Sequence, residues 1–137
     1  IKALSHLNDT SDYAVRFERG VEVTYGDRTH YYISGTASIS NKGEILFPCD
    51  VARQTDRVLE NIDALLKSSG SRFEEMAYLI VYIRDMSDFS VVEQRLSEKL
   101  VKVPYIILHA SVCRPGWLVE MEGIAISSKC GAGFPRF

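Results

Sequence analysis

The 137 residues of this chain, of which 46% are hydrophobic and 25% charged, predict one globular domain with a single core. Sixteen basic and eighteen acidic side chains leave a net charge of −2, so the sequence lacks the basic surface that binds a phosphate backbone, and we expect no nucleic-acid partner. The apolar runs are too short for a membrane span. Three cysteines without metal-like spacing indicate a reducing compartment, hence cytoplasmic residence, and no metal site.

The chain divides into three segments. Residues 1–12 are polar and aperiodic, and since they begin at Ile1 without a signal peptide, we expect an N-terminal segment that continues from a longer chain or was trimmed. Residues 13–127 form the folded domain. Residues 128–137 are rich in glycine, are interrupted by proline, and are interpreted as a C-terminal tail.

Strands are predicted in the first part of the domain. Residues 13–19 and 21–25 are rich in β-forming side chains, and Gly26-Asp27 separates them from a third run over 28–38. Gly20 between the first two runs is a bulge or a turn.

Two helices follow. The range 50–67 has one apolar stripe, with Asp50 as a plausible N-cap and Gly70 as a stop signal; the stripe contains Val51, Val58, Leu59, Ile62, Leu65 and Leu66. The range 87–101 predicts a second helix capped by Ser87 or Asp88, with its inward side made of Phe89, Val92, Leu96 and Leu100.

Three further strands are predicted over 76–84, 105–113 and 117–126. The order of elements is then β-β-β-α-β-α-β-β, which indicates an α+β fold with six strands.

The last two strands carry most of the chemistry. Pro115-Gly116 is a strong turn signal and predicts a hairpin in which Ser111 lies opposite Glu120. In that register one face shows His109, Ser111, Cys113, Glu120 and Glu122, and the other shows Ile106, Leu108, Ala110, Val112, Val119, Met121 and Ala125. A shift of one residue would separate Cys113 from Glu120.

Two helices cover only one face of such a sheet. The second face mixes aliphatic, aromatic and ionisable side chains, among them Tyr32, Tyr78 and Tyr82. Aromatic patches with polar rims are typical of interfaces, so we expect a homo-oligomer with ionisable groups near the subunit contact. The alternative is an ordinary solvated face.

Four stretches carry a family resemblance: YYISGTAS (31–38), 50–70, 76–93 and VCRPGWLVEMEGIAI (112–126). Together they resemble the RidA/YjgF superfamily, once called translation inhibitors or endoribonucleases L-PSP, over about 17–126. The resemblance implies a chorismate-mutase-like α+β fold, a mixed six-stranded sheet with two helices on one face, and a homotrimeric barrel with clefts between subunits. It also implies a small-molecule substrate and the hydrolysis of enamines or imines to ketoacids, without a cofactor.

The resemblance assigns roles to particular positions. The aromatic residue near the end of the first strand is Phe17, the cleft serine and glycine are Ser34 and Gly35, and the acid that holds the water is Glu120. Imine deaminases place a carboxylate-binding arginine two residues after the proline that opens the penultimate strand. That position is Ile106 here, so ordinary deamination lacks its usual anchor.

A closer likeness is to the C-terminal domain of chorismatases, through VCRPGWLVEMEG, FERG (17–20) and YYISGTASI (31–39). In that subfamily a cysteine and a glutamate seven residues later belong to the catalytic pocket. Those residues are Cys113 and Glu120 in this chain.

Residue chemistry leaves several roles open. Glu120 in a partly dry cleft would have a raised pKa and serve as general acid/base, but a surface glutamate or an ion-pair partner is the alternative, and Glu122 is a second candidate for the acid. Cys113 has no histidine within reach and is interpreted as lining the pocket.

The remaining candidates would bind substrate. Thr36 beside Ser34 supplies polar contacts, and Tyr82 is a candidate for the pocket wall. Arg19 and Arg84 are candidates to hold an anion, although either can be an ordinary solvated arginine.

The sequence therefore predicts a chorismatase-like hydrolase or lyase of a small metabolite. The alternatives are a non-catalytic trimer that binds a ligand or regulates a partner, an enamine/imine deaminase, and, less consistent with the charge, a ribonuclease.

Overall fold

The structure, a computed structural model, describes residues 1–13 and 17–136. In this part of the chain five strands form one mixed sheet in the order β1-β2-β5-β3-β4. Their bounds are Gly20–Thr24 (β1), Thr29–Ala37 (β2), Met76–Ile83 (β3), Tyr105–His109 (β4) and Val119–Ser127 (β5). Neighbouring strands are antiparallel except for β3 and β4, which are parallel. The expected α+β class and mixed sheet are confirmed.

The described residues give five strands where six were predicted. Of the predicted strand over 13–19, Tyr13 ends a short 3-10 helix (Thr10–Tyr13), residues 14–16 lie outside the described part, and residues 17–19 are not in a strand. A bulge in β2 explains why the pairing of β1 with β2 ends. Between Ile33 and Thr36 two residues of β2 face a single residue of β5, and the β1–β2 ladder stops at the pair Gly20–Ile33.

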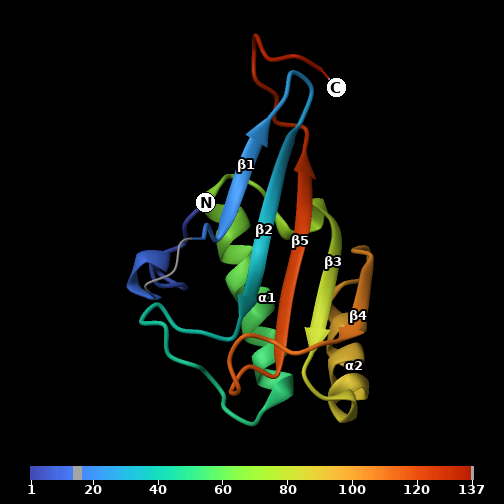
Figure 1. Ribbon diagram of the computed structural model, residues 1–137. Helices are drawn as coiled ribbons and strands as arrows, with labels where there is room; N and C mark the ends of the chain where they lie inside the picture. Colours follow the sequence, from blue (N-terminus) through green and yellow to red (C-terminus); the bar gives the residue numbers. More distant parts are fainter. Residues whose placement is uncertain (14–16, 137) are drawn as a thin grey trace.

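Both α-helices lie on one face of the sheet (Figure 1). Helix α1 (Val51–Ser68) begins as predicted, because the Asp50 side chain accepts a hydrogen bond of 2.9 Å from the Arg53 N–H. Gly70, with φ of +76°, follows its end. Helix α2 (Phe89–Lys99) follows a 3-10 turn (Met86–Asp88), and its N-cap Asp88 makes no side-chain capping bond. A third 3-10 turn (Phe73–Glu75) precedes β3.

The core lies between the helices and the sheet. The whole predicted stripe of α1 is buried, as are Val92, Leu96 and Leu100. Phe89, the first residue of α2, is exposed, contrary to the prediction. The sheet contributes Tyr31, Ile33, Leu79, Val81, Ile83, Val119, Met121 and Ala125.

The turn of the predicted hairpin is confirmed, but its strand pairing is wrong. Pro115-Gly116 does form a turn, in which the Trp117 N–H donates to the Arg114 carbonyl at 3.0 Å. The two flanking strands do not pair, however, because β5 lies between β2 and β3 while β4 pairs with β3 at the edge. A local turn signal does not determine which strands become neighbours.

Because β4 pairs with β3, its side chains lie on the opposite faces of the sheet from those predicted. Ile106 is opposite Ile80 and Leu108 is opposite Tyr82, so both side chains lie on the face away from the helices, where Ile106 is 54% exposed. Tyr105 and Ile107 pack against the core instead. The face without helices, here called the open face, therefore carries Val21, Tyr32, Tyr78, Ile80, Ile106, Leu108, Ile124 and Ile126. Within the described residues, no helix has the length and apolarity that crossing a membrane requires.

Packing of α1 on the sheet makes one prediction. Ile62 is fully buried, so Ile62→Ala removes its packing and leaves a cavity; we expect a loss of about 2–5 kcal/mol in the free energy of unfolding, measured by urea denaturation. Val101→Ala, at a site 82% exposed, is the control and should change this free energy little. A loss below about 1 kcal/mol for Ile62→Ala would contradict the described core.

Candidate active site

A cavity of about 350 Å³ lies where β1 begins, β2 ends and β5 begins. Its wall is completed by the loop over 110–118 that connects β4 to β5. The lining residues are Phe17, Arg19, Gly35, Ala37, Ile39, Cys113, Arg114, Trp117 and Glu120. This wall combines an acid, two guanidinium groups, a thiol and aromatic rings, which is the composition of a small-molecule site.

Glu120 is the acid of the cavity. It lies on β5 opposite Ala37, and its carboxylate sits directly above Gly35, where any Cβ would overlap Oε1. Burial, followed by the negative charge of Glu122, raises the pKa of the Glu120 carboxyl. A protonated carboxyl in a cavity can donate a proton to a bound molecule.

Glu122 has a different environment. Its Oε1 accepts a hydrogen bond of 2.7 Å from the Tyr82 hydroxyl. This bond, ahead of burial, raises the pKa of Tyr82. Neither residue is among those that line the cavity, so the structure distinguishes the favoured acid Glu120, which faces the cavity, from the second candidate Glu122, which is bound to Tyr82.

The bulge of β2 forms one edge of the cavity. The Ser34 hydroxyl donates to the Glu18 carbonyl at 2.6 Å, and the Ser34 N–H donates to the Arg19 carbonyl at 3.1 Å. The Thr36 hydroxyl donates to the Ser34 carbonyl at 2.8 Å. Of the predicted trio, Gly35 lines the cavity, whereas Ser34 and Thr36 use their hydroxyls to hold the backbone around it.

Two buried or half-buried side chains hold the loop over 110–118. Arg84, at the end of β3, donates to the carbonyls of Val112 (2.8 Å), Arg114 (2.6 Å) and Trp117 (2.8 Å). Arg84 thus binds the loop and does not line the cavity as an anion site would. On the other side, the fully buried Gln54 donates to the Gly116 carbonyl at 3.0 Å and accepts from the Leu118 N–H at 2.9 Å.

The loop presents Cys113 and Arg114 to the cavity. The thiol of Cys113 is exposed, and the Arg114 guanidinium lies 5.4 Å from the centre of the Trp117 ring. Although the predicted hairpin is absent, Cys113 and Glu120 line the same cavity, because the loop folds back over the start of β5.

Arg19 and Phe17 form the opposite wall. Arg19 is only 6% exposed, and its guanidinium carbon lies 5.0 Å from the centre of the Phe17 ring. Arg19 therefore brings a buried positive charge to the cavity.

The sequence missed several wall residues. Trp117, Ile39 and Arg114 line the cavity but are not among the residues that the sequence proposes for the site. The lone tryptophan beside a Pro-Gly turn was the available signal, since a large aromatic side chain next to a turn can cover a cavity.

Among the described residues, no group of three or more His, Cys, Asp or Glu side chains is arranged to hold a metal ion.

Comparison with known proteins gives a consistent result. The sequence model of the family described as "Endoribonuclease L-PSP" matches residues 12–127. A RutC family protein of Pyrococcus horikoshii is 30% identical over 96 residues, which are 69% of this chain and 76% of the relative. The 3-aminoacrylate deaminase RutC of Acinetobacter baylyi is 23% identical over the same shares of the two chains.

Solved structures agree in fold. The crystal structure of Escherichia coli TdcF with bound serine has a TM-score of 0.76 at 21% identity, covering 93% of this chain and 98% of that one. RidA from the Antarctic bacterium Psychrobacter also has a TM-score of 0.76 at 21% identity, covering 91% and 96%. The chain described here therefore belongs to the endoribonuclease L-PSP family, also known as the RidA/YjgF or RutC family.

Proposed function

We propose that the chain hydrolyses a small enamine or imine to a carbonyl compound and ammonia, with Glu120 as the general acid/base. The observation that carries the proposal is the Glu120 carboxyl, which has a raised pKa and lines a cavity of about 350 Å³. Membership of a family that includes a 3-aminoacrylate deaminase supports this chemistry above the chorismatase reading.

The proposed reaction needs one acid and one water. Protonated Glu120 donates to the carbon of the enamine double bond and leaves an iminium ion. The resulting carboxylate accepts a proton from a water molecule as the water oxygen attacks the iminium carbon. The carbinolamine that forms then loses ammonia, so that one enamine and one water give one carbonyl compound and one ammonia.

Other residues have supporting roles in this proposal. Cys113, Phe17 and Gly35 shape the cavity, while Ser34, Thr36 and Arg84 act through the backbone segments that they hold. Tyr82 holds Glu122, whose charge helps to keep the proton on Glu120.

A homotrimer that buries the open face is part of the proposal. Val21, Tyr32, Ile124 and Tyr78 are cross-strand partners and make one continuous apolar row. A continuous apolar row of this kind is unusual on a solvated face and is typical of a subunit contact. The cavity lies at the end of the same face, so a neighbouring subunit would help to exclude water from Glu120.

Hydrolysis of the enol ether of chorismate is the second candidate. It is supported by the spacing of Cys113 and Glu120 and by their presence in one cavity. Protonation of an enol ether carbon followed by water attack makes the same demand on the acid. A ribonuclease function is disfavoured by the net charge of −2.

Replacement of the acid is the first test. Glu120→Gln keeps the shape but cannot transfer the proton, so kcat should fall by about 10²–10⁴-fold. The assay follows ammonia and carbonyl product from 2-aminoacrylate generated in situ by a dehydratase, with chorismate in parallel. The matched variant Glu122→Gln should retain activity within about tenfold. Equal losses in both variants would reject Glu120 as the acid. No turnover by the wild type with either compound would reject the proposed enzyme and favour a binding protein.

The raised pKa of Glu120 also predicts a pH dependence of stability. The folded state binds the Glu120 proton more tightly than the unfolded state, so this group's contribution is full at low pH and is lost as the pH rises through the raised pKa. Glu120→Gln has no such loss. The free energy of unfolding of the variant minus that of the wild type should therefore increase from pH 4 to pH 8, measured by urea denaturation. A constant difference would show that the Glu120 carboxyl has an ordinary pKa.

Oligomeric state tests the buried open face. Light scattering of the wild type should give three times the 15.4 kDa of one chain. Tyr78→Glu places a charge on the apolar row and should shift the mass toward that of one chain, whereas Val101→Glu, at an exposed site just after α2, should not. A wild-type monomer would contradict the trimer.

A further inference from the structure

The loop over 38–50, which connects β2 to α1, contributes Ile39 to the wall of the large cavity. Its backbone adopts the left-handed conformation at two residues that are not glycine, Phe47 (φ +57°) and Cys49 (φ +61°). This conformation is unfavourable for a residue with a side chain and persists only where the surroundings hold it. The loop therefore depends on bonds from other elements to keep the shape of the wall.

Three polar side chains of α1 supply such bonds. Gln54, Arg57 and Asn61 recur at helical spacing, so they lie on one face of the helix. Gln54 Nε2 donates to the carbonyl of the strained Phe47 at 3.1 Å. Arg57 Nε and Asn61 Nδ2 each donate to the Ile39 carbonyl at 3.3 Å. The loop is thus bound to the helix both at a strained residue and at a residue that lines the cavity.

Gln54 also binds the second loop of the cavity, over 110–118. Its Nε2 donates to the Gly116 carbonyl at 3.0 Å, and its Oε1 accepts from the Leu118 N–H at 2.9 Å. The side chain is fully buried, so water cannot replace these bonds. The loops are also packed closely here, because a Cβ on Gly116 would lie 2.7 Å from the Ile45 side chain. One buried amide therefore joins the two loops that wall the cavity.

The bonds from Gln54 lie on both sides of Trp117 in the chain. The Trp117 N–H donates to the Arg114 carbonyl at 3.0 Å, and the Trp117 carbonyl accepts from Arg84 Nε at 2.8 Å. The carbonyl of Leu118 accepts from the Arg84 N–H at 2.9 Å. The backbone of Trp117 is thus held at both of its polar groups, while its side chain lines the cavity.

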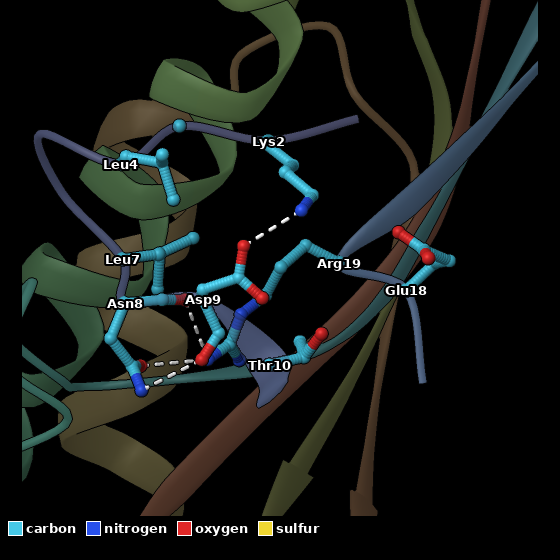
Figure 2. Close-up of a pocket in the computed structure, with 9 residues that line it drawn as sticks. Lys2, Leu4, Leu7, Asn8, Asp9, Thr10, Glu18 and Arg19 are labelled. Carbon is cyan, nitrogen blue, oxygen red and sulfur yellow. Dashed lines mark hydrogen bonds and ion pairs between the residues drawn. The ribbon is translucent and has the colours of Figure 1, made fainter. Parts of the chain in front are cut away.

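A neighbouring cavity, under the N-terminal segment, is too small for a substrate. Its volume is about 10 Å³, which holds at most one water molecule. Figure 2 shows that an ion pair between Lys2 and Asp9 and a hydrogen bond from Arg19 to Asn8 lie around it. Of these two adjacent cavities, the one of about 350 Å³ that contains Glu120 is the one with room for a substrate.

Apolar side chains make up much of the wall of this large cavity, namely Phe17, Ala37, Ile39 and Trp117. A volume of about 350 Å³ is typical of sites for ligands larger than a three-carbon enamine. An apolar group that leaves water to pack on such a wall favours binding. The cavity therefore fits an enamine whose end away from the reacting double bond is apolar.

We propose that Trp117 contacts the apolar, non-reacting end of the substrate, and that Gln54 is a positioning residue that places Trp117 by joining the two loops. The inference rests on the proposed function of the large cavity as the substrate site. It names the substrate class as enamines or imines with a branched apolar side chain. It also assigns this preference to two residues for which the family resemblance names no role.

The test measures binding of product-type ligands to the full chain and does not need turnover. Isothermal titration compares 2-oxopropanoate with 4-methyl-2-oxopentanoate, which share the reacting end and differ only in the apolar side chain. The wild type should bind the branched ligand more tightly by about tenfold or more. Trp117→Ala should reduce this ratio by about tenfold, whereas Trp117→Phe keeps an aromatic ring and should retain most of it.

Gln54→Glu tests the positioning residue. The carboxyl group still accepts from the Leu118 N–H but cannot donate to both the Phe47 and the Gly116 carbonyls, so the two loops lose part of their connection. The ratio between the two ligands should fall by about tenfold. Trp117 is the only tryptophan of the chain, so fluorescence reports its surroundings directly. Its emission should shift to longer wavelength, and quenching by acrylamide should increase.

Gln94→Glu, at an exposed site of α2, is the matched control and should keep both the ligand ratio and the emission of the wild type. Thermal melting shows whether each variant folds. If Gln54→Glu does not fold, Arg84→Lys takes its place, because a lysine lacks the planar fork that binds three carbonyls of the loop over 110–118. It should lower the ratio and shift the emission in the same way.

Three results would overturn the inference: a wild type that does not prefer the branched ligand, an unchanged ratio in Trp117→Ala, or an unchanged ratio in the folded positioning variant. Failure of the proposed function gives a different pattern. If Glu120 is not the acid, Glu120→Gln turns over normally, while the ligand ratio and its loss in the Trp117 and Gln54 variants persist.

Discussion

The extra residue in β2 is the constraint on which the site depends. At Ser34-Gly35 two residues face Glu122 alone, and beside this bulge the β1–β2 ladder ends at the pair Gly20–Ile33. Gly35 then offers no side chain, and the Glu120 carboxyl occupies the space above it. The two hydroxyls of the bulge are used for backbone bonds. A regular strand here would keep the Arg19 segment in the ladder and would crowd Glu120.

The local elements were predictable because each depends on nearby residues. The stripe of α1, its cap at Asp50 and the Arg114–Trp117 turn follow from side-chain periodicity and turn chemistry, and all three are present. The order of the strands was not predictable in this way. The insertion of β5 between β2 and β3 depends on pairing between distant segments. It places the side chains of Ile106 and Leu108 on the face opposite to the predicted one.

The candidate site shows the same division. Phe17, Gly35, Cys113 and Glu120 were proposed from motifs and line one cavity. Ser34, Thr36 and Arg84 belong to the same motifs, but the structure gives them hydrogen bonds to backbone carbonyls. A motif identifies residues that a fold requires near a site without distinguishing contact with ligand from support of the loop. Only the hydrogen-bond partners make that distinction, which is why the sequence could not assign Arg84.

Charge in the cavity affects the proposed reaction. Burial and, after it, the negative charge of Glu122 raise the pKa of the Glu120 carboxyl, because both disfavour a carboxylate there. An anionic substrate in this cavity would add another negative charge close to Glu120 and disfavour its ionisation further. By linkage, protonated Glu120 in turn favours binding of the anion, because the site then holds one negative charge fewer. Binding of an anion and protonation of the acid therefore support each other.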